Sequence, residues 1–249
     1  MRNIKMTIQY DGTRYNGWQK QNQKDSTAKT IQGKIENVLS KMTEEEVNVI
    51  GCGRTDSGVH AENYIANFFT DCMLPTYEME KYLEEYLPKD IVIKELKIAK
   101  DRFHARYNVK AKTYVYKIDN NRYNNVFTRD FTNHIPNELD IENMKKAAEY
   151  LIGTHDFKSF TSLKAKHNKS TLRTINYINI NKNDGLIEIE VNANSFLLNM
   201  VRIIAGTLIE VGEGKLIAED VETILVEKNR EKAGQKAPAK GLTLKEVQY

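Results

Sequence analysis

The chain has 249 residues, of which 40% are hydrophobic and 29% charged, and its formal net charge is +3. This length suits one large domain or two fused halves with their own cores, so disorder of the whole chain is excluded. No run approaches the roughly 20 apolar residues that a membrane span needs. Polar residues interrupt every apolar run of the first segment, so we expect no signal peptide. We therefore expect a cytoplasmic protein that does not associate with a membrane.

The first half predicts six elements in the order strand, helix, strand, strand, helix, strand. Apolar residues alternate with polar ones in the first segment, and they recur at helical spacing behind Thr30, a candidate N-cap, in the second. A polar loop over residues 19–29 separates these two segments. The expected elements are, in order, 3–10, 31–42, 47–53, 64–69, 77–87 and 90–99.

The second half predicts four strands and three helices. Two of its strands are joined by the turn sequence Lys182-Asn183-Asp184-Gly185, which indicates a hairpin. One helix is expected to stop at Gly153. The expected elements are, in order, strand 112–118, helix 141–153, strands 174–181 and 186–193, helices 196–214 and 217–228, and strand 242–249.

These elements predict an α+β fold with a mainly antiparallel sheet and helices packed on it. The two halves have a loosely similar element order, and no linker rich in Pro, Gly or Ser divides them. We therefore expect two similar halves, 1–106 and 107–249, that share one continuous sheet.

Metal and disulfide chemistry are not expected. The two cysteines, Cys52 and Cys72, have neither a second Cys nor a His at the close spacing of a zinc site. Charge is unevenly distributed, with basic residues concentrated in 158–173 and acidic ones in 43–48 and 77–87. This distribution predicts one basic face.

The loop Gly53–Ala61, with the sequence GRTDSGVHA, places Arg, Thr, Asp and His directly after a predicted strand. Loops at strand ends present side chains to clefts. Composition alone, however, favours a simple turn, in which Asp56 and Ser57 form an Asx turn and Gly58 supplies a positive φ. The loop taken by itself leaves both interpretations open.

Six segments in the same order resemble the TruA-type tRNA pseudouridine synthases. They include YDGTRYNGWQKQ, the GRTDSGVHA loop and FHARYNVKAKTYVYKI, and they extend over nearly the whole chain. Their ranges are 10–21, 53–61, 103–118, 153–160, 196–214 and 237–249. Six matches in register make this resemblance far more specific than any single motif.

The resemblance implies a pseudouridine synthase fold and an isomerase that acts on tRNA. Family members convert uridine to pseudouridine in the anticodon stem-loop, at tRNA positions 38, 39 and 40. The bond from ribose to base nitrogen one breaks, and carbon five replaces it, so no cofactor is implied. Family members are homodimers in which one tRNA spans both subunits.

Four residues match the family's active site. Asp56 matches the aspartate that attacks the nucleotide, and Arg202 matches the arginine that offsets the desolvation of its charge. Tyr114 matches the tyrosine that stacks on the target base, although Tyr116 faces the same side of the strand. Arg54 matches an arginine that holds the flipped nucleotide out of its stack. Attack at base carbon six, attack at ribose carbon one and removal of a ribose proton remain alternative routes for Asp56.

The basic segment 158–173 is in most proteins a solvated surface, but a tRNA substrate favours phosphate contacts there. The RNA-binding candidates in it are Lys164, Lys166, Lys169 and Arg173. For His60, His104 and His155 we expect structural roles.

One departure from the family pattern follows the loop, where Asn63 and Tyr64 replace a Gly-Gln pair. Two other functions are weighed against the synthase. A tRNA-binding module without catalysis would have no need of Asp56, Tyr114 and Arg202 together. A hydrolase would need a second acid as proton donor, and the loop has none before Glu62.

Overall fold

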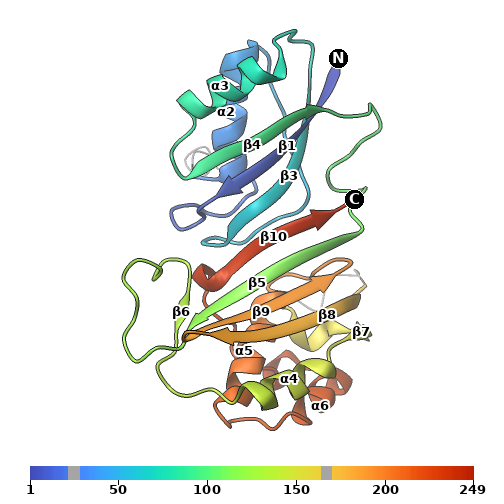
Figure 1. The fold of residues 1–249 in the computed structure, drawn as a ribbon. Coiled ribbons are helices and arrows are strands. Elements are labelled where there is room, and N and C mark those ends of the chain that lie inside the picture. The colour runs from blue at the N-terminus through green and yellow to red at the C-terminus, as the bar shows by residue number, and fades with distance from the viewer. Residues whose placement is uncertain (22–28, 164–169) are drawn as a thin grey trace. The chain divides into compact units, whose positions relative to one another are not determined.

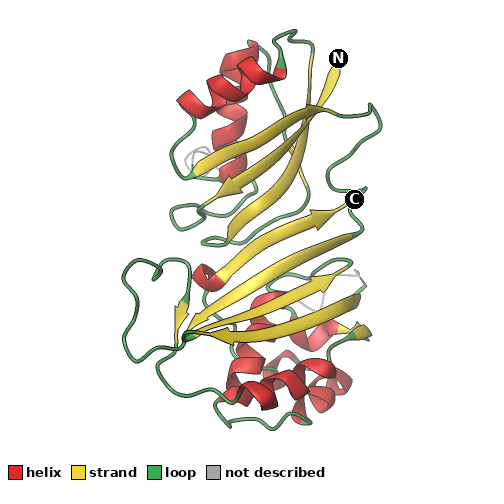
Figure 2. Cartoon of the chain, viewed as in Figure 1, coloured by secondary structure: helices red, strands yellow, loops and turns green. Residues whose placement is uncertain are grey.

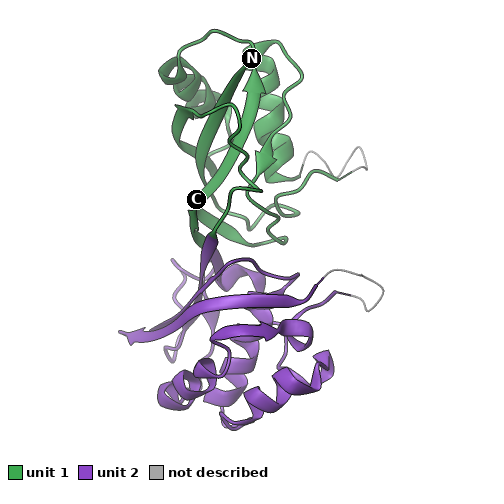
Figure 3. Ribbon diagram, turned by 90° about the vertical axis from the view of Figure 1, so that its right-hand side faces the viewer, with its two compact units in different colours: residues 1–110, 244–249 green, residues 111–243 purple. Residues whose placement is uncertain are grey.

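The computed structural model describes residues 1–21, 29–163 and 170–249 (Figure 1). These residues divide into two compact units (Figure 3). Unit 1 contains residues 1–110 and 244–249, and unit 2 contains residues 111–243. The last strand of the chain therefore begins in unit 2 and continues in unit 1. The halves 1–106 and 107–249 expected from the sequence stay a prediction.

Unit 1 has a sheet with the strand order β4 (Ile91–Ile98), β1 (Arg2–Tyr10), β3 (His60–Thr70) and β10 (Leu242–Gln248). Strand β1 is antiparallel to both neighbours, and its Met6 lies opposite Ala66 and Leu96. The short strand β2 (Ile50–Gly51) pairs with β3. Helix α3 (Thr76–Tyr86) packs on β4 and on helix α2 (Ile31–Thr43) (Figure 1).

The elements of unit 1 follow directly from the sequence pattern. Thr30 is the N-cap of α2, and its Oγ1 accepts a hydrogen bond of 3.2 Å from the Gly33 amide. Ile35 and Leu39 on the apolar face of α2 are fully buried, as is Met6 on β1. Burying a side chain of this size contributes about 1.5–3 kcal/mol.

The C-terminal residues are tied to unit 1 by several hydrogen bonds. The Asn63 side-chain amide donates to the Lys245 carbonyl at 2.8 Å, and the Lys110 amide donates to the Gln248 carbonyl at 2.9 Å. The hydroxyl of Tyr249 donates to the Ala105 carbonyl at 2.7 Å. Residues 244–249 are therefore an integral part of this unit.

Unit 2 has a sheet with the strand order β5 (Ala111–Asp119), β9 (Leu186–Ala193), β8 (Leu172–Asn183) and β7 (Gly153–Asp156) (Figure 2). Neighbours in this order are antiparallel, whereas the short strand β6 (Asn133–His134) pairs with β5 in parallel. Helix α4 packs on α5 and β8, and α5 contacts β5. The helices are α4 (Ile141–Glu149), α5 (Met200–Gly212) and α6 (Asp220–Glu227), with 3-10 turns at Phe157–Phe160, Arg230–Lys232 and Ala239–Gly241.

The predicted fold class is confirmed, since helices pack on a mixed sheet. Its pairs β1–β3, β1–β4, β5–β9, β8–β9 and β7–β8 are antiparallel, and β6 pairs with β5 in parallel. The hairpin is confirmed as well: Asp184 and Gly185 have φ of 46° and 77°, as a two-residue turn of this kind requires. Helix 196–214 was predicted too long. It begins only at Met200, because Asn199 has a left-handed backbone with φ of 61°.

Three further boundaries differ from the prediction. Helix 141–153 ends at Glu149, and Gly153, with φ of 106°, begins β7 instead of ending the helix. Helix 217–228 is confined to Asp220–Glu227, and strand 47–53 to Ile50–Gly51. The predicted polar loop 19–29 lies largely outside the described residues. No helix among the described residues is long and apolar enough to cross a membrane.

Candidate active site

The loop Gly53–Ala61, called the Asp56 loop from here on, follows β2 and extends into the first two residues of β3 in unit 1. Its side chains are divided between the core and the surface. Thr55 is 7% exposed, and its Oγ1 lies 2.8 Å from the hydroxyl of Tyr10. Asp56 is half-buried, and Arg54 is exposed. The structure thus anchors the loop through Thr55 and places the two candidate side chains on either side of this anchor.

The backbone of the Asp56 loop rests on residues 10–19, which we call the support segment. The Trp18 amide donates to the Thr55 carbonyl at 3.2 Å. The Tyr15 carbonyl accepts from the Ser57 hydroxyl at 3.0 Å. Two motifs far apart in sequence are therefore one structural element.

This contact between two backbones requires glycine in the support segment. Gly17 has φ of 86°, and a Cβ there would lie 2.5 Å from the Thr55 carbonyl oxygen. A Cβ on Gly12 would lie 2.0 Å from the Val59 carbonyl oxygen. No other residue lets the support segment approach the loop this closely.

Two aromatic side chains fix the ends of the Asp56 loop. His60 is 2% exposed, and its Nδ1 accepts a hydrogen bond of 3.1 Å from the Gly12 amide. Tyr64 stacks on Trp18 with ring centroids 3.9 Å apart, and its hydroxyl donates to the Gly53 carbonyl. His60 therefore makes a structural contact, as expected, and Tyr64, a departure from the family pattern, supports the loop.

Tyr114 and Arg202 lie in unit 2, on β5 and on the first turn of α5. Tyr114 is 8% exposed and packs edge to face against Phe196, with centroids 5.2 Å apart. The Arg202 Nε donates to the Ala237 carbonyl at 2.8 Å, and its NH1 group donates to the Asn199 side chain at 3.3 Å. Because α5 contacts β5, the two candidates belong to adjacent elements.

Tyr116, the alternative to Tyr114, is fully buried, and its hydroxyl donates to the Pro238 carbonyl at 3.0 Å. Burial raises the pKa of this hydroxyl far above its usual value, while the positive charge of Arg202 acts in the opposite direction. A phenol held in this way is a core side chain, and the contact of Tyr114 with substrate stays a prediction.

The family model of the tRNA pseudouridine synthases matches residues 6–108 and 147–249. The chain belongs to this family. Pseudouridine synthases are isomerases, so the protein is an enzyme of this type. The match in two stretches agrees with two similar halves.

Named members of the family align with the whole chain. "tRNA pseudouridine synthase A 1" of Clostridium tetani is 60% identical over 249 residues, which cover 100% of both chains. "tRNA pseudouridine synthase A 2" of Bacillus cereus is 48% identical with the same coverage. A solved structure of a Cbf5-Nop10-Gar1 complex is similar with a TM-score of 0.33 and 10% identity. The match covers 97% of this chain and 48% of that chain.

Of the basic candidates, only Arg173 is among the described residues; Lys164, Lys166 and Lys169 lie outside them. The Arg173 guanidinium donates to the Ser170 carbonyl at 3.0 Å and to the Leu172 carbonyl at 2.5 Å. Burial lowers the pKa of this guanidinium. Arg173 therefore fixes the backbone at the start of β8, and its contact with RNA stays a prediction.

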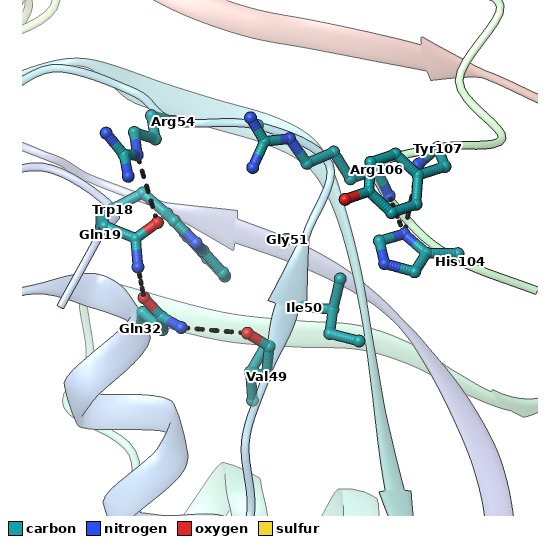
Figure 4. A pocket seen from close by; sticks show the side chains of 11 residues that line it. Trp18, Gln19, Gln32, Val49, Ile50, Gly51, Arg54, His104, Arg106 and Tyr107 are labelled. Atoms are coloured by element: carbon teal, nitrogen blue, oxygen red, sulfur yellow. Dashed lines mark hydrogen bonds between the residues drawn. The ribbon is translucent and has the colours of Figure 1, made fainter.

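Sequence reasoning missed the partners of Arg54. The Arg54 Nε donates to the Gln19 side chain at 3.3 Å, and Gln19 donates in turn to Gln32 at 2.9 Å (Figure 4). These three side chains line a pocket to which Arg106 and Tyr107 also contribute. The available signal was that Gln19, Arg106 and Tyr107 all lie in segments that resemble the family. Within the described residues, no group of three His, Cys, Asp or Glu residues could hold a metal ion.

Proposed function

We propose that this chain isomerises uridine to pseudouridine in the anticodon stem-loop of tRNA, with Asp56 as the nucleophile. The observation that carries the proposal is the 60% identity, over the full length of both chains, with a protein named tRNA pseudouridine synthase A 1. The geometry of the Asp56 loop supports it, because a carboxylate on a loop fixed by backbone contacts is preorganised for attack.

The chemistry needs no oxidant, reductant or energy source. Asp56 attacks the nucleotide, the bond from ribose carbon one to base nitrogen one breaks, and the base rotates. A bond then forms from ribose carbon one to base carbon five, and Asp56 is released as a carboxylate. Base nitrogen one takes up a proton, and the hydrogen on carbon five leaves as a proton. We assign this proton transfer and the stacking of the base to Tyr114, the ion pair with Asp56 to Arg202, and support of the flipped nucleotide to Arg54.

The wider setting follows from the same proposal. We propose a cytoplasmic homodimer in which one tRNA spans both subunits, as the family resemblance implies. Sequence-independent affinity would come from phosphate contacts of the basic segment. The proposed contacts are Lys164, Lys166, Lys169 and Arg173.

The test compares the parent with Asp56→Asn on tRNA that carries tritium at uridine carbon five. We expect the parent to release tritium to water and Asp56→Asn to release essentially none, while both bind tRNA with similar affinity. Asn has almost the same shape as Asp, so the loop keeps its structure. Asp71→Asn is the matched control, since Asp71 is an exposed carboxylate that follows the opposite end of β3.

Each alternative function has its own outcome in this assay. Substantial release by Asp56→Asn refutes the nucleophile assignment. A parent that binds tRNA and releases no tritium is a binding module instead. Free uracil or cleaved tRNA among the products indicates a hydrolase.

A further inference from the structure

A pocket of about 200 Å³ lies in unit 1 beside the Asp56 loop (Figure 4). Three separate segments form most of it: the end of the support segment at Trp18 and Gln19, the stretch from Val49 to Arg54, and the stretch from His104 to Tyr107. Arg54 and Gly53 line it, but Asp56 does not. The pocket is therefore next to the proposed catalytic residue without including it.

The positive charge of the pocket suits an anionic ligand. Arg54 and Arg106 are both exposed and both line the pocket. The described lining residues include no Asp or Glu, and the Arg106 guanidinium has no hydrogen-bond or ion-pair partner among the described residues. Two guanidinium groups in one pocket repel each other, and a phosphate between them would remove this repulsion.

The position of Arg54 is fixed by a chain of amides. The Gln32 Nε2 donates to the Val49 carbonyl at 3.0 Å, and the Gln32 Oε1 accepts from Gln19 at 2.9 Å. These contacts orient Gln19, whose Oε1 accepts from the Arg54 Nε. The terminal nitrogens of Arg54 are thereby left to donate to a ligand.

An aromatic platform stands at the other side of the pocket. Tyr107 is 79% exposed, and its ring stacks on that of His104 with centroids 4.1 Å apart and 25° between the planes. The His104 Nδ1 accepts from the amides of Arg106 and Tyr107 at 3.1 and 3.2 Å, which holds this turn in place. A large, exposed aromatic ring that the backbone fixes is suited to stacking with a nucleobase.

We propose that this pocket binds the nucleotide adjacent to the target uridine, with its base stacked on Tyr107 and its phosphate held between Arg54 and Arg106. The inference rests on the proposed function for its RNA substrate. Arg54 and Asp56 are two residues apart on one loop, so the nucleotide next to the target would meet the pocket. Stacking and phosphate contact read no base edge, so the subsite accepts any base.

The test measures kcat/KM for tritium release and the salt dependence of tRNA binding for single variants. We expect Tyr107→Ala to lower kcat/KM roughly 5- to 150-fold, as the loss of one base stack does. Tyr107→Phe, which keeps the ring, should stay within about twofold of the parent. Arg106→Gln should reduce the log–log salt slope by about 0.7–0.9, the value of one phosphate contact, whereas Lys81→Gln on α3, outside the pocket, should not change it.

A second measurement identifies the nucleotide. The substrates are tRNAs that each carry one abasic nucleotide beside the modified uridine. At one of these positions the missing base should weaken tRNA binding by the parent. Binding by Tyr107→Ala should not change there, because this variant already lacks the ring on which the base would stack. Parental kcat/KM for Tyr107→Ala, or equal losses for parent and variant at every abasic position, would overturn the proposal. If the parent forms no pseudouridine, the proposed function fails, and the binding measurements alone decide about the pocket.

Discussion

Replacing Gly17 by Ala should displace the Asp56 loop and lower activity much more than stability. A Cβ at this position lies 2.5 Å from the Thr55 carbonyl oxygen, about 0.9 Å short of the 3.4 Å at which ordinary van der Waals contact begins. The neighbour is backbone, so the loop itself must move. A misplacement near 1 Å costs up to about 100-fold in rate, and we expect kcat/KM to fall roughly 10- to 100-fold.

The stability cost can be measured separately with a matched glycine. Gly214 has φ of 71°, close to the 86° of Gly17, but a Cβ there meets nothing within 4 Å. Both substitutions impose a left-handed backbone on Ala, at a cost of about 1–2 kcal/mol. Gly214→Ala should therefore lower the melting temperature and leave kcat/KM at the parental value.

The assay is tritium release from tRNA, with circular dichroism and thermal unfolding on the same preparations. The reasoning is refuted if Gly17→Ala, folded by circular dichroism, keeps parental kcat/KM. It is refuted equally if Gly214→Ala loses as much activity as Gly17→Ala, because backbone strain alone would then explain the effect.

Three other predictions follow. Burial acts to raise the pKa of the Asp119 carboxyl, but hydrogen bonds from Asn125 and Asn121 outweigh this effect and hold the pKa below its usual value. The ionised Asp119 therefore stabilises the fold at neutral pH. This contribution is lost as the pH falls through the lowered pKa. The difference in unfolding free energy between parent and Asp119→Asn, measured with urea, should shrink from pH 7 to pH 3, and a constant difference contradicts the assignment. tRNA binding should weaken steeply with rising salt. Replacing Lys164, Lys166 and Lys169 together by Ala should reduce the slope of log affinity against log salt by about 2–3 units. An unchanged slope would place the RNA-binding face elsewhere. Activity should be complete in EDTA because the isomerisation needs no Lewis acid or redox partner, and a divalent ion required by the protein, beyond any need of the tRNA fold, would contradict this.

Local sequence patterns predicted helix α2 closely. The spacing of Ile31, Ile35 and Leu39 behind Thr30 gave α2 within a residue, since capping and amphipathicity are local properties. The start of α5 could not be predicted in the same way. The apolar run 196–198 continues the helical pattern in the sequence, but the left-handed backbone of Asn199 separates this run from the helix.

The site was predicted only in part. Asp56 and Arg54 belong to one motif, so the loop itself was evident from the sequence. The pocket is formed by residues from three distant segments, and no local pattern connects Gln19 with Tyr107. The role of Gly17 was also hidden, because the sequence does not show which backbone approaches it.

The C-terminal strand has a consequence for folding during synthesis. Residues 244–249 complete the sheet of unit 1 beside β3, yet the ribosome makes them after all of unit 2. Until then only the short strand β2 pairs with this edge of β3, and the rest of the edge has no neighbour. An open strand edge promotes aggregation. Unit 1 emerges from the ribosome first, but its last strand is made after unit 2. A chain that ends before residue 244 therefore lacks a strand in the unit that carries Asp56.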